Sequence, residues 1–106
     1  MPDQKKIKFL TEKSETLKVI AHPMRLCILN CLMTVDECNV KTLTQRMETP
    51  QSTISQHLSK LKSHNIIEGQ RHGVEIQYKV VDHNVMELMK LLLRDLEDDE
   101  KKPINC

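Results

Sequence analysis

Apolar and polar positions follow two different periods along this chain. Through 5–21, 23–33, 40–47, 50–64 and 82–97 the apolar residues recur every three or four positions, whereas through 74–80 they recur every second position. The first period is typical of a helix with one buried side, and the second is typical of a strand with one buried face. The pattern therefore predicts four helices, a β-hairpin and a fifth helix, in that order.

Residues that favour helix ends stand at these boundaries. A capping side chain satisfies a free N–H of the first turn, and proline suits the first helical position because its missing N–H costs nothing there. Asn65 is a plausible stop for the fourth helix, and Gly73 is expected in or next to the hairpin turn. The expected helix starts are marked by Pro23, by Asn39, by Thr49 as N-cap with Pro50 as first residue, and by Asp82.

The helix at 49–64 has an unusual polar surface. Ile54, Leu58 and Leu61 form one narrow apolar stripe, and no acidic residue lies between Pro50 and His64. Short hydroxyl and amide side chains can hydrogen-bond base edges and phosphates, and the lack of carboxylates removes repulsion from a polyanion. We expect this helix to lie in a DNA major groove; the alternative is an ordinary exposed helix rich in Ser and Gln. The candidate DNA contacts are Gln51, Ser52, Thr53, Ser55, Gln56 and His57, with Lys60 and Lys62 on phosphate.

The short helix at 40–47 is separated from this polar helix by only a few residues, which indicates a helix-turn-helix. The hairpin that follows would then be a wing. Arg71 and His72 at its tip could enter the minor groove or touch phosphate, or they could be no more than polar turn residues. The expected fold is a mainly α winged helix-turn-helix, with one domain at 1–98 and a flexible tail at 99–106.

The last helix is apolar on more than one side. A domain of this size offers too little surface to cover such a helix, so its second face is expected to meet another subunit. The prediction is a homodimer; the alternative is a monomer in which the helix is well buried. The expected interface residues are Leu10 and Leu17 of the first helix and Val85, Leu88, Met89, Leu92 and Leu96 of the last.

Composition adds to this picture. The chain has 106 residues with one Tyr, one Phe and no Trp, which indicates a single domain with an aliphatic core. The net charge of +1 conceals an excess of basic residues through 41–79 and of acidic residues through 82–100, so only one half suits nucleic acid. No apolar run approaches the ~20 residues needed to span a bilayer, and a cytoplasmic location is expected.

Two other classes of function compete with DNA binding. A winged helix that binds a protein would carry an apolar outer face on the helix at 49–64, and this one is polar. An enzyme is not expected, because two glycines are too few to suggest a phosphate-cradling loop and no catalytic group is evident.

Several segments together resemble the ArsR/SmtB family of bacterial winged-helix repressors. They are Ala-His-Pro-Met-Arg-Leu at 21–26, Pro-Gln-Ser-Thr-Ile-Ser-Gln-His-Leu at 50–58, Ile66-Ile67, and the strand at 73–80 with Tyr78. The run at 50–58, with His-Pro-Met-Arg-Leu before it, is similar to the toxin-gene repressor branch found in bacilli. The resemblance implies a dimer that binds an inverted-repeat operator, represses transcription, and often releases DNA when it binds metal or is oxidised.

The resemblance also locates the family's metal sites. Where the family has two thiols in the third helix, this chain has only Cys38, and one thiolate cannot hold a thiophilic ion. A second family site uses Asp and His ligands across the paired last helices. This chain offers Asp82, Asn84, Asp95 and Asp98 there, with His83 one place out of register. Solvated acidic residues explain this set better, so neither a metal nor a cofactor is expected.

Cys27 and Cys31 lie four residues apart on one side of the second helix, roughly opposite its apolar stripe. This spacing holds Cβ atoms ~5–6 Å apart, whereas a disulfide needs ~3.5–4.5 Å. The thiols could be inert packing groups, they could react with an oxidant or form a bridge to Cys106 or across the dimer, or they could clamp a soft ion. Relatives that sense through two thiols would place them at Asn30 and near Glu97 or Asp98, so Cys31 and Cys106 do not match.

Overall fold

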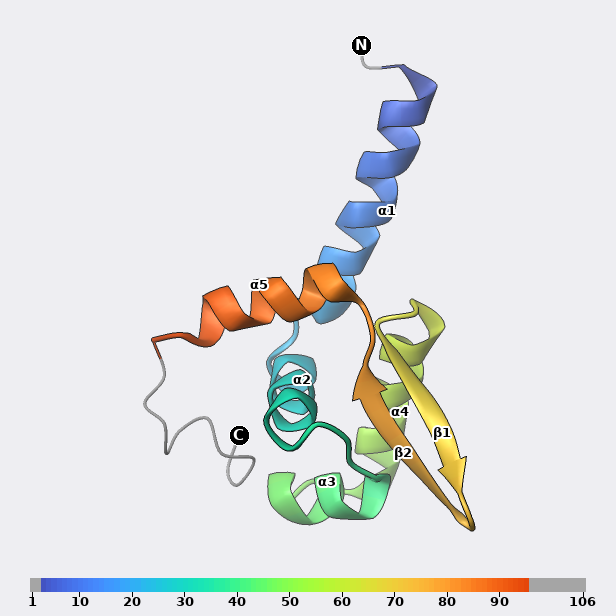
Figure 1. The fold of residues 1–106 in the computed structure, drawn as a ribbon, viewed down its shortest axis with the longest axis vertical. Helices are drawn as coiled ribbons and strands as arrows, with labels where there is room; N and C mark the ends of the chain where they lie inside the picture. Colours follow the sequence, from blue (N-terminus) through green and yellow to red (C-terminus); the bar gives the residue numbers. More distant parts are fainter. Residues whose placement is uncertain (1–2, 96–106) are drawn as a thin grey trace.

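The computed structural model describes residues 3–95 and shows the predicted order of elements. The helices α2 and α4 form the body with α3 below them, the two-stranded hairpin lies along one side, α5 crosses the top, and α1 projects away (Figure 1). Among residues 3–95 no single helix has the length and apolar content to cross a membrane. Only α1 and α2 counted as one segment have that length and apolar content, and the two helices meet at a bend of 91°. The elements are α1 (Gln4–Ile20), α2 (Pro23–Val35), α3 (Val40–Met47), α4 (Gln51–Ser63), β1 (Ile67–His72), β2 (Glu75–Val80) and α5 (His83–Leu93).

Capping side chains fix most of the helix starts where the sequence places them. The Asn39 side-chain oxygen accepts a hydrogen bond from the N–H of Thr42 at 2.8 Å, and Asp82 caps α5 in the same way at 3.1 Å. The predicted cap of α4 is wrong: Pro50 is the N-cap and the helix begins one residue later. The Thr49 hydroxyl instead donates to the carbonyl of Met47 at 2.9 Å, and this bond closes the end of α3. Asn65, with φ of 57°, follows α4 as expected.

The hairpin is short and its turn is tight. β1 and β2 pair antiparallel from Ile67 opposite Val80 to His72 opposite Glu75. Gly73, with φ of +67°, supplies the left-handed conformation that the turn requires. Val74 was expected to begin the alternation of the second strand, but it lies in the turn and is 95% exposed.

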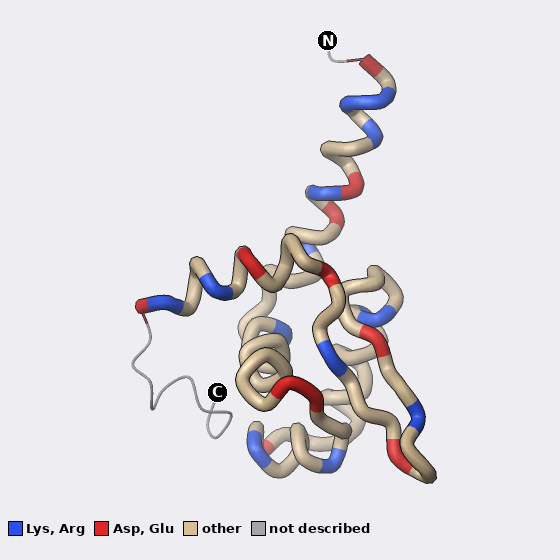
Figure 2. The backbone as a smooth tube through the Cα atoms, in the orientation of Figure 1, with Lys and Arg blue, Asp and Glu red and all other residues tan. Residues whose placement is uncertain are grey.

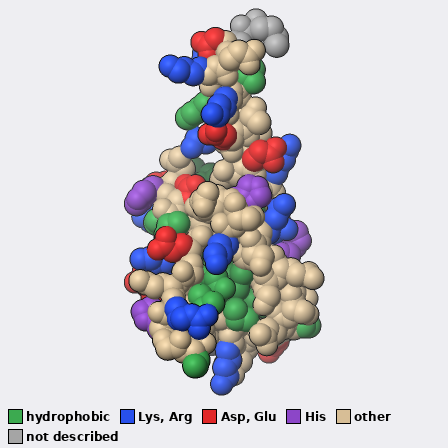
Figure 3. Space-filling view, turned by 90° about the vertical axis from the view of Figure 1, so that its right-hand side faces the viewer, with side chains coloured by type: hydrophobic (Ala, Val, Ile, Leu, Met, Phe, Trp, Pro, Cys, Tyr) green, Lys and Arg blue, Asp and Glu red, His purple; other side chains and the backbone are tan. Residues whose placement is uncertain are grey.

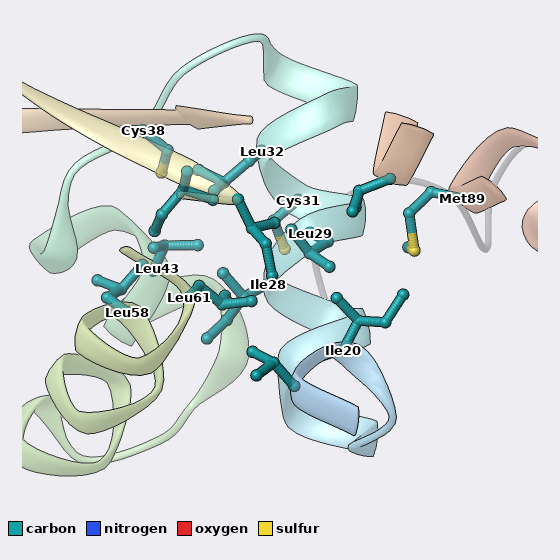
Figure 4. Close-up of a cluster of buried hydrophobic side chains, with 14 of the residues drawn as sticks. Ile20, Ile28, Leu29, Cys31, Leu32, Cys38, Leu43, Leu58, Leu61 and Met89 are labelled. Atoms are coloured by element: carbon teal, nitrogen blue, oxygen red, sulfur yellow. The ribbon is translucent and has the colours of Figure 1, made fainter. Parts of the chain in front are cut away.

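One continuous aliphatic core holds the helices and the base of the hairpin together (Figure 4). Five consecutive residues of α2, from 28 to 32, are buried because α2 is packed against other elements on several sides. The expectation that Cys31 faces away from the core is therefore wrong: its side chain is fully buried. The buried apolar residues are Val19, Ile20, Ile28, Leu29, Cys31, Leu32, Cys38, Leu43, Ile54, Leu58, Leu61, Ile66, Ile67, Val85 and Met89.

The apolar surface of α5 is divided between the chain's own core and solvent. Val85 and Met89 were predicted to face a second subunit, but they are 2% and 0% exposed and pack inside their own subunit. Leu88 is half-buried and Leu92 is exposed. The helix ends at Leu93, four residues before the predicted end, and Leu96 and the predicted tail at 99–106 lie outside the described residues.

Candidate nucleic-acid interface

The outer face of α4 is polar and free of acidic side chains. Ile54, Leu58 and Leu61 are buried and fix the rotation of the helix on the body. The opposite side is exposed and carries Gln51, Ser52, Gln56, Ser59, Lys60, Lys62 and Ser63. Thr53 and Ser55 are half-buried at the edges of this face. The arrangement presents amide and hydroxyl groups outward from a rigidly packed helix.

The structure adds a groove that the sequence reasoning missed. It has a volume of about 370 Å³, lies between α3 and the start of α4, and is lined by Lys41, Thr44, Gln45 and Gln51. Lys41 and Gln45 are exposed and four residues apart, so they share one side of α3. The spacing of Lys41 and Gln45 could have indicated a shared polar side of α3. Only the packing of α3 against α4 places these two side chains beside Gln51.

The wing presents Arg71 and His72, which are both exposed. Two contacts hold β2 of the wing against the start of α3. Cys38 and Tyr78 exchange backbone hydrogen bonds of 2.8 and 3.0 Å, and the Asn39 amide donates to the Glu75 carboxylate at 2.9 Å. The second contact engages an acidic group of the wing, and it fixes the hairpin relative to the helix-turn-helix.

Charge is distributed unevenly over the molecule. No acidic residue lies on α4, and the acidic residues of α1 lie on its projecting part (Figure 2). In the view from the right-hand side of Figure 1, the charged side chains of the lower part are mainly Lys and Arg, with His near the edges (Figure 3). This face is compatible with a polyanion.

His57 differs from the other predicted DNA contacts. It is half-buried, and its Nδ1 accepts a hydrogen bond from Arg25 Nε at 3.2 Å. Its ring lies 4.7 Å from the ring of His22 at an interplanar angle of 52°. Burial lowers the pKa of His57, and the nearby His22 and Arg25 lower it further. His57 was predicted to read or orient on the major groove; its Nδ1 is engaged by Arg25 within its own chain, and a contact with DNA stays a prediction.

The three cysteines within residues 3–95 comprise one accessible and two inaccessible thiols. Cys27 is half-buried, whereas Cys31 and Cys38 are buried. A hydrogen bond from Cys31 lowers the pKa of Cys27 against the opposing effect of burial. That same bond, together with burial, raises the pKa of Cys31. Burial also raises the pKa of Cys38. Cys106 lies outside the described residues.

The predicted acidic set at α5 has other roles in this structure. The Asp82 carboxylate caps α5, and Asn84 and Asp95 are exposed. Asp98 lies outside the described residues. Within residues 3–95, no three His, Cys, Asp or Glu side chains are grouped so as to hold a metal ion.

Comparison with known proteins places these features in context. A helix-turn-helix domain family matches residues 20–70. The transcriptional repressor PagR of Bacillus anthracis is 41% identical over 83 residues, which are 78% of this chain and 83% of PagR. Its crystal structure has a TM-score of 0.76 at 40% identity and covers 81% of this chain and 98% of that one.

Two mycobacterial proteins extend the comparison. The HTH-type transcriptional repressor SmtB of Mycobacterium tuberculosis is 32% identical over 80 residues, which are 76% of this chain and 58% of SmtB. The homodimeric winged helix-turn-helix domain of Mb0332 from Mycobacterium bovis, described as a possible ArsR-family regulator, has a TM-score of 0.78 at 26% identity. The match covers 88% of this chain and 85% of that domain.

Proposed function

Because this chain belongs to the ArsR/SmtB family of winged helix-turn-helix transcriptional repressors, we propose that its homodimer places two α4 helices in successive major grooves of an inverted-repeat operator. The chain is a DNA-binding repressor. The observation that carries the proposed geometry is the exposed, carboxylate-free face of α4. A carboxylate on this face would meet phosphate repulsion, whereas amides and hydroxyls can bond to base edges.

Gln51 and Gln56 are the side chains best suited to base readout. Both are exposed on α4, and an amide can donate and accept at the same time, as the edge of adenine requires. Ser52, Thr53 and Ser55 flank them and would orient the helix through hydroxyl contacts. His57 is left out of the direct contacts, because its ring is bonded to Arg25.

The basic residues around this helix would contact phosphate. Lys60 and Lys62 lie in its last turn, Lys41 lies on α3, and Arg71 lies on the wing. Phosphate contacts position the protein without reading sequence, and each one steepens the salt dependence of binding. The small number of such residues per subunit indicates moderate affinity, and because a homodimer doubles the number of phosphate contacts, binding should fall steeply with salt.

The apolar surfaces of α1 and α5 supply the dimer contact. Ile7, Leu10 and Leu17 are exposed along α1, and Leu91 and Leu92 are exposed on α5. Apolar residues at this helical spacing on a projecting helix suit a second helix at a two-fold axis. A two-fold axis would give the two α4 helices the opposite directions that an inverted repeat requires.

The test is a gel shift on DNA upstream of the chain's own gene with two variants. Gln56→Ala should weaken binding by about 1–3 kcal/mol and relax base preference at one operator position. Arg71→Ala should weaken binding equally on all sequences and reduce the salt slope by about one. Lys8→Gln, which removes one positive charge from α1, is the control and should bind like the parent. If Gln56→Ala and Arg71→Ala both bind like the parent, the assigned contacts are wrong.

The same assay addresses the protein-binding alternative and the sensing sites. A chain that binds no upstream DNA under any condition would favour a winged helix that contacts a protein. Binding should be measured under reducing conditions, after oxidant, and with zinc, cadmium or arsenite. Unchanged binding throughout would indicate a repressor without a thiol or metal inducer.

Cys27 is expected to be the first of the three described thiols to react. It is half-buried, and the hydrogen bond from Cys31 favours its thiolate, which is the nucleophilic form. In a Cys106→Ser background, iodoacetamide near neutral pH should modify one thiol, which peptide mass spectrometry should place at Cys27. Cys31 and Cys38 should react only after denaturation. Modification of Cys31 in the folded chain at the rate of Cys27 would contradict the burial of that side chain.

A further inference from the structure

A cluster of three side chains joins α4 to the junction of α1 and α2. Arg25 lies in the first turn of α2, His22 is the N-cap of that helix, and His57 lies in the middle of α4. Arg25 Nε donates to His57 Nδ1 at 3.2 Å, and its Nη1 donates to the carbonyl of Val19 at 3.0 Å. One guanidinium therefore bonds the end of α1 and the middle of α4 at the same time.

The two imidazoles of the cluster must both be neutral for these bonds to exist. His22 Nδ1 accepts from the N–H of Met24 at 3.1 Å, and His57 Nδ1 accepts from Arg25. A neutral imidazole has one acceptor nitrogen, whereas a protonated imidazole has none. Protonation of His57 would replace the hydrogen bond with repulsion between two cations, and protonation of His22 would remove the side-chain cap of α2.

We propose that Arg25 is a positioning residue for DNA binding, which holds α4 in its reading orientation through the neutral ring of His57. The inference rests on the proposed placement of α4 in the major groove. The buried stripe fixes one side of α4, and the bond from Arg25 to His57 anchors the helix at a second point, directly after the Gln56 that is proposed to read a base. Because another nitrogen of the same guanidinium bonds the end of α1, Arg25 links the proposed dimer helix to the DNA-reading helix.

The cluster gives this positioning role a dependence on pH. The charged or titratable groups that act on His57 are Arg25 from α2 and His22 from the α1–α2 junction; within residues 3–95 no carboxylate acts on it. The pKa of His57 is lowered from 6.5 by burial and by these two groups. The contribution of the neutral ring to stability is therefore present above pH 6.5, and it is lost as the pH falls through the pKa of the folded state.

The decisive variant is His57→Asn, because its side-chain carbonyl can still accept from Arg25 but cannot titrate near neutral pH. Its affinity for the upstream DNA should lie within about twofold of the parent at pH 7.5. Between pH 7.5 and 5.5 the parent should lose several-fold more affinity than this variant, because protonation of His57 breaks its hydrogen bond to Arg25 and the asparagine cannot be protonated in this range. Arg25→Met should bind weakly already at pH 7.5, and adding His57→Asn to it should change nothing further.

His64→Asn is the matched control. His64 lies at the end of the same helix, and its Nδ1 lies 3.2 Å from the carbonyl of Lys60 and from the Ser63 hydroxyl, apart from the cluster. The variant removes a second histidine at the end of this helix and leaves the cluster of Arg25, His22 and His57 intact. It should keep the pH profile of the parent.

Three outcomes would overturn the inference. They are identical pH profiles for the parent and His57→Asn, parental affinity for Arg25→Met, or loss of affinity in His57→Asn at pH 7.5 as large as that in Arg25→Met. The last would indicate that His57 contacts DNA itself. Failure of the proposed function has a different signature, since the parent would then bind no upstream DNA at any pH. In that case the melting temperature without DNA still tests the cluster. Between pH 7.5 and 5.5 the melting temperature of the parent should fall further than that of His57→Asn.

Discussion

Leu17→Glu is expected to abolish dimerisation and to lower operator affinity by about a hundredfold or more, because two linked half-site contacts bind far more tightly than one. Leu17 is 53% exposed and lies on α1 in line with Leu10, which is 50% exposed. A carboxylate there would be buried against its two-fold mate in the proposed dimer, and burial of an unpaired charge is costly. Sedimentation would measure the loss of the dimer, and a gel shift at the same protein concentration would measure the loss of operator affinity.

The control for this substitution is Lys8→Gln, which changes the charge of α1 by the same single unit. Lys8 is exposed on a different side of the helix from Leu10 and Leu17. It should leave both the mass of the assembly and the affinity unchanged. A Leu17→Glu chain that remains dimeric would place the interface elsewhere, whereas a monomer that binds the full operator with parental affinity would contradict the requirement for two paired helices.

Leu58→Ala is expected to destabilise the fold by ~2–5 kcal/mol, which is a large part of the stability of a small domain. Leu58 is 2% exposed and packs α4 onto the core, so the truncated side chain leaves a cavity under the DNA-reading helix. The melting temperature should fall by at least about 10 °C. Thermal unfolding followed by circular dichroism would measure it, at fixed protein concentration because a dimer's stability depends on concentration.

Ser59→Ala is the neighbouring control. Ser59 is exposed on the same helix, and no packing is lost when its hydroxyl is removed. Its melting temperature should stay within about 4 °C of the parent, since surface substitutions usually cost less than about 0.5 kcal/mol. A melting temperature for Leu58→Ala as close to the parent as that of Ser59→Ala would contradict the role of the buried stripe in anchoring α4.

Much of the fold could be predicted because its signals are local. Asn39 and Asp82 cap their helices within three residues of sequence, and the period of two at 76–80 needs only its own strand. The exception, Thr49, shows the limit of this reasoning. Thr49 was predicted to cap α4, but its hydroxyl donates to the carbonyl of Met47 at the end of α3.

The candidate interface was predictable in part for the same reason. The acid-free face of α4 follows from residue types on one helix, and Gln51 and Gln56 are exposed as expected. The direction of His57 was not predictable, because its partner Arg25 lies 32 residues earlier in the chain. The groove formed by Lys41 and Gln45 with Gln51 likewise depends on how α3 packs against α4.

The sequence by itself determined which segments are helices and strands and which helix is free of acidic residues, since periodicity and capping act within a few residues. Only the tertiary structure decided which sides of those helices meet solvent. Cys31 is buried because α2 is packed on more than one side, and Met89 is turned into its own core instead of toward a partner. The physical reason is that helical period defines an apolar side but not the number of neighbours that cover it, and burial depends on those neighbours.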